Sequence, residues 1–148
     1  MQRTQNYNLC QWAAEDRIMR SDFNADNQKI DAALAAQQAA MPRIAFGSYV
    51  GDGRYGSSHK NTMTFDFAPK LVIICGYEYY AILFRGCSFG AGIRTDVSSE
   101  HSILEAIWSD NGISWYCKKV CTSNTIGTVS AKQQLNNIDI TYQYIAIG

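Results

Sequence analysis

The chain has no excess of charge of either sign, since its 148 residues carry 13 acidic and 13 basic side chains. A nucleic-acid-binding protein needs a concentration of basic residues on one face, and electrostatic attachment to a membrane needs the same. We therefore expect neither nucleic acid nor a charged membrane surface as a partner.

Long hydrophobic runs are also missing. Stretches such as Leu71 to Cys75 reach only five residues, whereas a membrane-spanning helix needs about 20. The opening residues, MQRTQNYNLCQW, lack the apolar core of a secretory signal peptide. These absences predict a chain that is made in the cytoplasm and does not insert into a membrane.

Cysteine and histidine are too few to favour a metal centre. The five cysteines are an odd number in a chain of this length, unlike a disulfide-rich scaffold, and Cys75 in its apolar run is typical of a core residue. Cys117 and Cys121 could supply two ligands of a zinc site that needs four, but the only histidines are His59 and His101. We expect no metal, and a site completed by a symmetry-related copy is the open alternative.

Signatures of cofactor binding and catalysis are weak. The segment from Gly51 to Gly56 spells G-x-G-x-x-G, but the residues that follow alternate like a strand and offer no helix to hold a pyrophosphate. Residues 98–102 combine serine, glutamate and histidine, yet the members of a catalytic triad converge from distant parts of a fold. We therefore predict no cofactor, no catalytic residue and no enzyme.

The stretch from Ser21 to Met41 is the clearest helix in the chain. It contains neither Gly nor Pro, begins with the capping residues Ser21 and Asp22, and ends before Pro42. Two interleaved heptad rows place its larger apolar side chains on one side, and this stripe is too thin to hold a lone helix in water. We expect sister chains to cover it, with an asparagine setting the register. The predicted oligomerisation residues are Phe23, Asn27, Ile30, Leu34 and Met41.

Residues 1–20 hold too few apolar side chains for a core of their own. They predict a small attachment segment, with a short helix from Cys10 to Arg20, that docks on the base of the long helix or, as we favour, on another protein.

After Pro42 the sequence becomes rich in glycine and β-branched residues, which predicts a β-rich head over residues 43–148. Alternating segments separated by turn residues are typical of an antiparallel β-sandwich, and Asn111-Gly112 predicts a type I′ hairpin. The apolar run from Leu71 to Cys75 predicts a strand covered on both faces. The expected strands are residues 44–50, 62–67, 71–75, 79–85, 102–108, 113–119 and 138–147.

These segments carry a resemblance to a family. The start, NYNLCQWAAEDRIMRSDFNADNQKIDAAL, resembles the N-terminal part of tail-fibre and tail-tip proteins of phages and prophages of Gram-positive gut bacteria. The segments IAFGSYVGDG, FDFAPKLVIICG, DNGISWYCKKV and AKQQLNNIDITYQYIAIG resemble their C-terminal heads. The resemblance implies a homotrimer in the virion tail, with residues 1–20 attached to a tail or baseplate protein, 21–42 forming the coiled-coil oligomerisation helix, and the head binding a receptor during host adsorption.

The ligand of such a head is expected to be a host-surface glycan or protein. Residues 78–103 match nothing in the family, and such variable parts often carry the ligand site. Tyrosine and tryptophan suit sugar rings and protein surfaces alike, and paired arginines suit carboxylate or phosphate. The alternatives are a purely structural tail-tip or decoration subunit without a ligand and, well behind, a cell-wall hydrolase. The candidate ligand-binding residues are Tyr77, Glu78, Tyr79, Tyr80, Arg85, Arg94 and Trp115.

Overall fold

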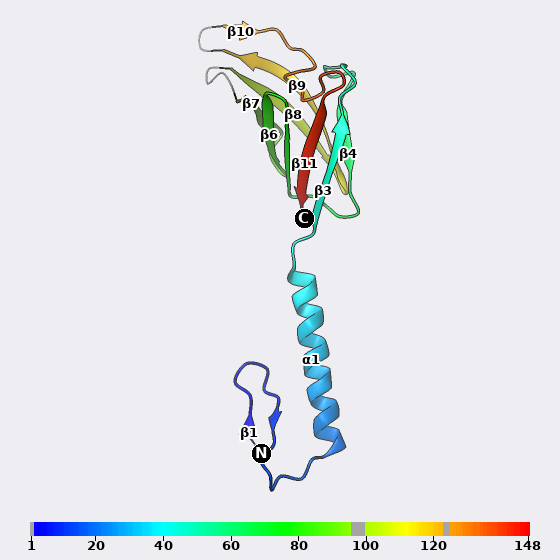
Figure 1. The fold of residues 1–148 in the computed structure, drawn as a ribbon, viewed down its shortest axis with the longest axis vertical. Coiled ribbons are helices and arrows are strands. Elements are labelled where there is room, and N and C mark those ends of the chain that lie inside the picture. The colour runs from blue at the N-terminus through cyan, green and yellow to red at the C-terminus, as the bar shows by residue number, and fades with distance from the viewer. Residues whose placement is uncertain (1, 96–99, 123–124) are drawn as a thin grey trace. The chain divides into compact units, whose positions relative to one another are not determined.

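The computed structural model describes residues 2–95, 100–122 and 125–148. The chain divides into two compact units (Figure 1): an N-terminal unit that ends at Met41 and a head that begins at Pro42. The elements in chain order are β1 (Gln2–Arg3), β2 (Cys10–Gln11), α1 (Arg20–Ala40), β3 (Ile44–Val50), β4 (Asn61–Thr64), β5 (Leu71–Gly76), β6 (Tyr79–Phe84), β7 (Phe89–Arg94), β8 (His101–Ser109), β9 (Gly112–Cys121), β10 (Ile126–Gly127) and β11 (Thr141–Ile147).

The N-terminal unit is a small hairpin docked on the first half of α1. The hairpin is anchored by Asp26, whose carboxylate accepts the Cys10 amide at 2.6 Å and the Lys29 ammonium at 3.0 Å. Lys29 also donates to the carbonyl of Asn8 at 2.7 Å, and Arg3 lies 3.6 Å from Asp26. Hydrogen bonds from Cys10 lower the pKa of Asp26 to about 2. The predicted helix over Cys10 to Arg20 is wrong, because Cys10–Gln11 pairs as β2 and α1 begins only at Arg20.

Helix α1 has the predicted extent to within one residue, but its start differs. Met19 is the N-cap and makes no side-chain capping bond, so the predicted capping role of Ser21 and Asp22 is wrong. No residue of α1 is buried. Among the described residues, no helix is long and apolar enough to cross a membrane. The candidate oligomerisation residues are exposed in the single chain: Phe23 by 58%, Ile30 by 41%, Leu34 by 60% and Met41 by 62%, with Asn27 also exposed.

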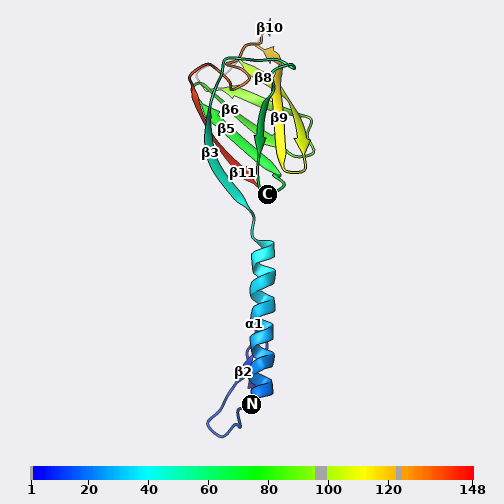
Figure 2. The same cartoon turned by 90° about the vertical axis from the view of Figure 1, so that its right-hand side faces the viewer.

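The head is mainly β. Within its described residues, nine strands join one antiparallel sheet in the order β10-β9-β8-β7-β6-β5-β11-β3, and β4 pairs with the opening residues of β9. The sheet curls so that its two halves face each other across one core, as Figures 1 and 2 show from two directions. This is the expected antiparallel β-sandwich. In the described chain β3 pairs only with β11 and β4 only with β9, so each keeps one unpaired edge.

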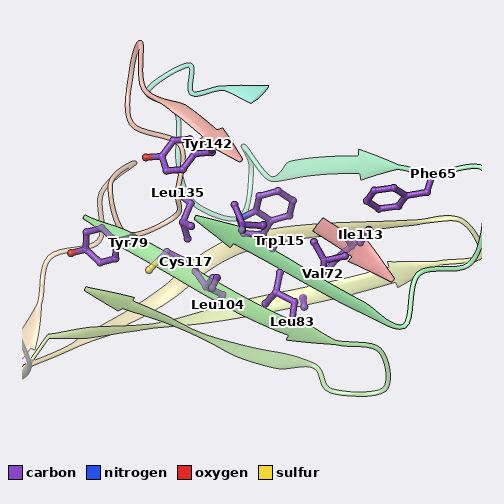
Figure 3. Close-up of a cluster of buried hydrophobic side chains, with 14 of the residues drawn as sticks. Phe65, Val72, Tyr79, Leu83, Leu104, Ile113, Trp115, Cys117, Leu135 and Tyr142 are labelled. Carbon is purple, nitrogen blue, oxygen red and sulfur yellow. The ribbon is translucent and has the colours of Figure 1, made fainter. Parts of the chain in front are cut away.

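The core comes from the inward-facing side chains of these strands, because alternate residues of a strand point to opposite faces. Figure 3 shows these side chains between the strands, with Tyr79 toward one end and Phe65 toward the other. Trp115 and Tyr142 are the largest fully buried side chains. The segment between β10 and β11 adds Leu135 to the same cluster, so this connection closes part of the core.

The outer face of β5 is more exposed than the sequence predicts. Val72 and Ile74 are fully buried, but Leu71 and Ile73 are only half-buried and Cys75 is exposed. The prediction that this strand is covered on both faces, with Cys75 in the core, is therefore wrong for the single chain. The outward apolar side chains of β5 remain uncovered within the described residues.

The glycine-rich stretch 85–94 has the composition of an exposed loop, but Phe89–Arg94 is strand β7. Its glycines face the interior, where larger residues of neighbouring strands need their space. A Cβ atom on Gly90 would collide with the Leu83 side chain, and one on Gly92 with the Ser102 hydroxyl. The glycines thus serve close packing between strands rather than flexibility.

The hairpin between β8 and β9 is present, but its turn differs from the prediction. The two turn residues are Asp110 and Asn111, and Gly112 already pairs with Ser109. Neither Asn111 nor Gly112 has a positive φ, so the type I′ assignment is wrong. Gly112 is instead required because a Cβ atom there would lie 2.5 Å from the backbone carbonyl oxygen of Met63 on β4.

Strand ends were less predictable than strand positions. The strand expected over 62–67 ends at Thr64, although Phe65 and Phe67 keep the inward alternation. The last strand begins at Thr141, because Asp139 has a φ of 60° and Ile138 is 61% exposed.

Candidate functional site

Tyr77 and Glu78, two of the candidate ligand residues, form the tight turn between β5 and β6. Tyr77 is 59% exposed and has a φ of 56°, a conformation in which a bulky residue is an outlier. Lys132 holds its ammonium 5.1 Å from the centre of the Tyr77 ring. Glu78 follows in the turn, and its carbonyl accepts the Thr95 amide at 2.7 Å. We call this the tyrosine turn.

An ion-pair cluster packs beside the tyrosine turn. Glu78 pairs with Lys132 at 2.8 Å and with Arg94 at 3.3 Å, and Arg94 pairs in turn with Glu100 at 3.2 Å. The buried Tyr79 donates its hydroxyl to Glu100. The hydrogen bond from Lys132 lowers the pKa of Glu78, and the one from Tyr79 lowers the pKa of Glu100. The cluster therefore pairs its own charges internally.

The lowered pKa of Glu100 predicts acid sensitivity of the head. A carboxyl group with a lowered folded-state pKa stabilises the fold above its ordinary pKa of 4.5, and this contribution is lost as the pH falls toward the lowered value. In Glu100→Gln, we expect the thermal midpoint to fall less between neutral pH and about pH 3 than in the wild type. Asp110→Asn, in an exposed turn, is the control and should keep the wild-type pH slope. An equally steep slope in Glu100→Gln would contradict this role.

The seven candidate ligand residues do not come together. Tyr77, Glu78 and Arg94 lie in or beside the tyrosine turn, whereas Arg85 follows the opposite end of β6, about 20 Å along the strand. The Arg85 guanidinium donates to the carbonyls of Pro69 and Ser109 at 2.6 and 2.8 Å. It is therefore engaged in the fold, and the prediction that Arg85 and Arg94 form one anion site is wrong.

The aromatic candidates divide in the same way. Tyr79 and Trp115 are 2% and 1% exposed, and the indole N–H of Trp115 donates to the Gln134 carbonyl at 2.9 Å. The Tyr79 ring offers no face to a ligand, so Tyr79 was wrongly predicted as a contact residue. Trp115 is almost fully buried, but it belongs to the lining of the second site described below. Tyr80 is half-buried on the outer face of β6, opposite Ile93. Only Tyr77 presents an exposed ring from this set.

A second candidate site lies between the two unpaired edges. A cleft of about 600 Å³ opens between β3 and β4, and we call it the β3–β4 cleft. Half-buried or buried aromatic side chains lie at its base, and polar side chains of the two strands and of the loop 51–60 form its walls. The rings include Tyr49, Tyr144 and Trp115, and the polar residues include Ser48, Asp52, Arg54, Ser58, His59, Lys60, Asn61, Thr62 and Thr64.

Tyr49 is fixed from several sides at the base of this cleft. Its ring stacks on Tyr142 with centroids 5.2 Å apart and meets the edge of Trp115 at 6.1 Å. Its hydroxyl donates to the Leu135 carbonyl at 2.5 Å, and burial raises its pKa. The base of the cleft is therefore a rigid aromatic surface set by the core itself.

The loop wall of the cleft is held by the buried Gln134. Its amide oxygen accepts the amides of Gly56 at 2.8 Å and Cys117 at 3.2 Å. Its amide nitrogen donates to the His59 carbonyl at 2.7 Å and to Asn61 Oδ1 at 2.9 Å. One fully buried side chain thus joins the loop, β4 and β9.

Asn136 secures the start of the same loop. Its amide nitrogen donates to Asp52 at 2.6 Å and to the Arg54 carbonyl at 2.9 Å. A Cβ atom on Gly51 would collide with the backbone carbonyl of Asn137. The G-x-G-x-x-G segment is thus an anchored loop that leads into strand β4, without a following helix, and it makes no phosphate-binding turn of the dinucleotide-binding kind.

The residues weighed for metal and catalysis take other roles. Within the described ranges no three potential ligands gather. Burial raises the pKa of Cys117 to about 11, which disfavours the thiolate that a metal binds. His101 pairs across β8 and β9 with Cys121 on the outer face. Ser98 and Ser99 lie outside the described residues, and Ser102 is buried with its hydroxyl donating to backbone carbonyls.

Sequence reasoning missed the β3–β4 cleft because its walls are non-local. Tyr49 and Thr62 are separated by a loop, and Tyr144 comes from the last strand. The available signal was the glycine-rich loop itself.

Comparisons with protein-family models, with curated proteins and with solved structures find no match to the chain. A functional proposal therefore depends on the site geometry and on the family resemblance of the sequence.

Proposed function

We propose that this chain is a phage or prophage tail protein of the tail-fibre or tail-tip kind. In this proposal α1 joins three copies, residues 1–20 attach the assembly to a tail or baseplate protein, and the β-sandwich head binds a host-surface glycan. The family resemblance and the uncovered heptad rows of α1 support the assembly. The proposed role is binding, without catalysis.

The main support for a binding role is the β3–β4 cleft. It combines aromatic rings held rigidly at the base with exposed hydroxyl and charged side chains on both walls. Small-ligand sites typically combine an apolar base with a few directing polar groups. The rings suit the apolar faces of sugars, and hydroxyls such as those of Ser48 and Thr62 suit their hydroxyl groups. A glycan fits this combination better than a flat protein surface does.

Charge on the cleft favours an anionic glycan. Arg54 and Lys60 contribute two cations, and Asp52 is the one acid in the lining of the described cleft. Arg54 lies 3.6 Å from Asp52 and remains 68% exposed at its side chain, so it stays accessible to a ligand.

Replacing Arg54 and Lys60 together with alanine is expected to weaken glycan binding roughly tenfold to a hundredfold, because two charge-assisted contacts are lost. The measurement is binding of the full chain to an array of purified neutral and anionic bacterial surface polysaccharides, followed by titration of those bound by the wild type. Lys70→Ala, an exposed lysine outside the cleft lining, is the matched control and should bind like the wild type.

Two outcomes would contradict the cleft assignment. One is a double alanine variant that binds as tightly as the wild type. The other is a loss of binding on Tyr77→Ala with Arg54 and Lys60 intact, which would assign the site to the tyrosine turn.

A purely structural subunit is the second candidate function. It is favoured by the ion-pair cluster, because the charges of Glu78, Arg94, Glu100 and Lys132 are already paired with one another without a ligand. In that case no polysaccharide of the array binds, and virions that carry alanine at Arg54 and Lys60 adsorb normally.

A further inference from the structure

The outer face of the head carries a continuous apolar row across six strands. Residues directly opposite each other in antiparallel strands point to the same side of a sheet. Strand pairing places one outward apolar side chain on each of β3, β11, β5, β6, β7 and β8 in a single line. We call this line the apolar row, and it consists of Phe46, Ile145, Ile73, Ile82, Ala91 and Ile103.

Large side chains next to the row widen it into a patch. Phe46 is 76% exposed and Ile82 40%, and the neighbouring Phe84 and Phe89 are 55% and 52% exposed. At ~150–250 Å² for a large buried side chain, the exposed apolar surface of the row and its neighbours is on the order of 600 Å². The largest apolar patches on monomeric proteins reach about 600 Å², and specific interfaces bury roughly 600–1,000 Å² on each partner. The patch thus lies at the upper end for a monomer and at the lower end for an interface.

The two ends of the row differ in shape. At the β3 end Phe46 projects from an edge strand. At the other end lies a groove of about 770 Å³, which we call the β7–β9 groove. Its apolar lining includes Phe89, Ala91, Ile103 and Ile126, and Lys118 and Lys119 also line it. A projecting ring and an apolar hollow on one face are complementary between two copies placed head to tail. Such heterologous contacts close into a ring when the rotation between successive copies closes, as it does for three copies related by a three-fold axis.

We propose that Phe46 of one copy packs into the β7–β9 groove of the next copy, so that the heads form a closed ring. This inference rests on the proposed trimer, because α1 would hold sister heads together at millimolar effective concentration. At that concentration a sister copy covers the patch before any other partner reaches it. The face of β5 that the sequence indicates as covered, and that the single chain leaves open, is then covered by the assembly.

The test is disulfide cross-linking of the full chain. Phe46→Cys and Ala91→Cys are combined in a background where Cys10, Cys75, Cys87 and Cys121 are serine and only the buried Cys117 remains, and the protein is oxidised with diamide. We expect covalent dimers and trimers on a non-reducing gel. Phe46→Cys alone and Ala91→Cys alone should stay uncrosslinked, and so should Thr62→Cys combined with Ala91→Cys, since Thr62 lies on the cleft.

Three results would overturn the ring. Cross-linking of Phe46→Cys alone would indicate a two-fold contact through β3. A lack of cross-linking in the double variant, while light scattering still gives a trimer, would leave the helix assembly standing and remove the contact between heads. A monomer in light scattering would contradict the proposed trimer as well, so the two failures are distinguishable.

Discussion

Replacing Gln134 with leucine is expected to lower the free energy of unfolding of the head by about 3 kcal/mol, because buried groups that lose their partner cost roughly 1–3 kcal/mol each. Leucine fills a similar volume but makes none of the four hydrogen bonds of the Gln134 amide. The amide of Cys117 then loses its partner inside the core. For a unit of this size the thermal midpoint should fall by roughly 15 °C, as calorimetry would measure.

Gln143→Leu is the matched control for this change. Gln143 is exposed on β11, and surface substitutions of this kind usually change stability by less than about 0.5 kcal/mol. The Gln134 variant should also lose glycan binding even where it remains folded, since the loop wall of the cleft is no longer held. A Gln134→Leu head as stable as the wild type would contradict the role given to this side chain.

Placing glutamate at both Ile30 and Leu34 is expected to convert the assembly into monomers. Both side chains lie in the heptad rows and are 41% and 60% exposed in the single chain. Two negative charges per copy at a shared helix interface are repelled by those of the neighbours and lose hydration if they are buried. Sedimentation equilibrium should show the fall in mass, and circular dichroism should show the head still folded.

Ala32→Glu combined with Ala36→Glu is the matched control. The same two charges at the same spacing then lie on the opposite side of α1. This variant should keep the mass of the wild type. If the control dissociates as readily as the Ile30 and Leu34 variant, the effect comes from charge on the helix and the predicted face is wrong.

The sequence predicted local structure well where hydrophobic periodicity and helix propensity dominate. The helix expected over 21–41 spans Arg20–Ala40, and the strand expected over 44–50 spans Ile44–Val50. Sequence was least informative about glycine. In β7, Gly90 and Gly92 suggested a loop, because their role depends on Leu83 and Ser102, which approach only in the folded sheet.

The candidate site was harder to predict than the fold. Aromatic residues near one another in sequence suggested a ligand surface, but Tyr79 points inward from β6, whereas Tyr77 lies in the preceding turn with a φ of 56° and stays exposed. The β3–β4 cleft forms because two strand edges remain unpaired, and pairing is a property of the whole sheet. The sequence does indicate that β5 is apolar on both faces, and in the structure its outward Ile73 is part of the apolar row.

The most direct test of this account is the mass of the unmodified chain in solution, measured by light scattering at several concentrations. The chain's own fold leaves apolar side chains uncovered on α1, such as Phe23, and on the outer face of the head, such as Phe46. The account predicts three copies of the 16.5 kDa chain, about 50 kDa in all. A folded 16.5 kDa species across the concentration range would contradict it.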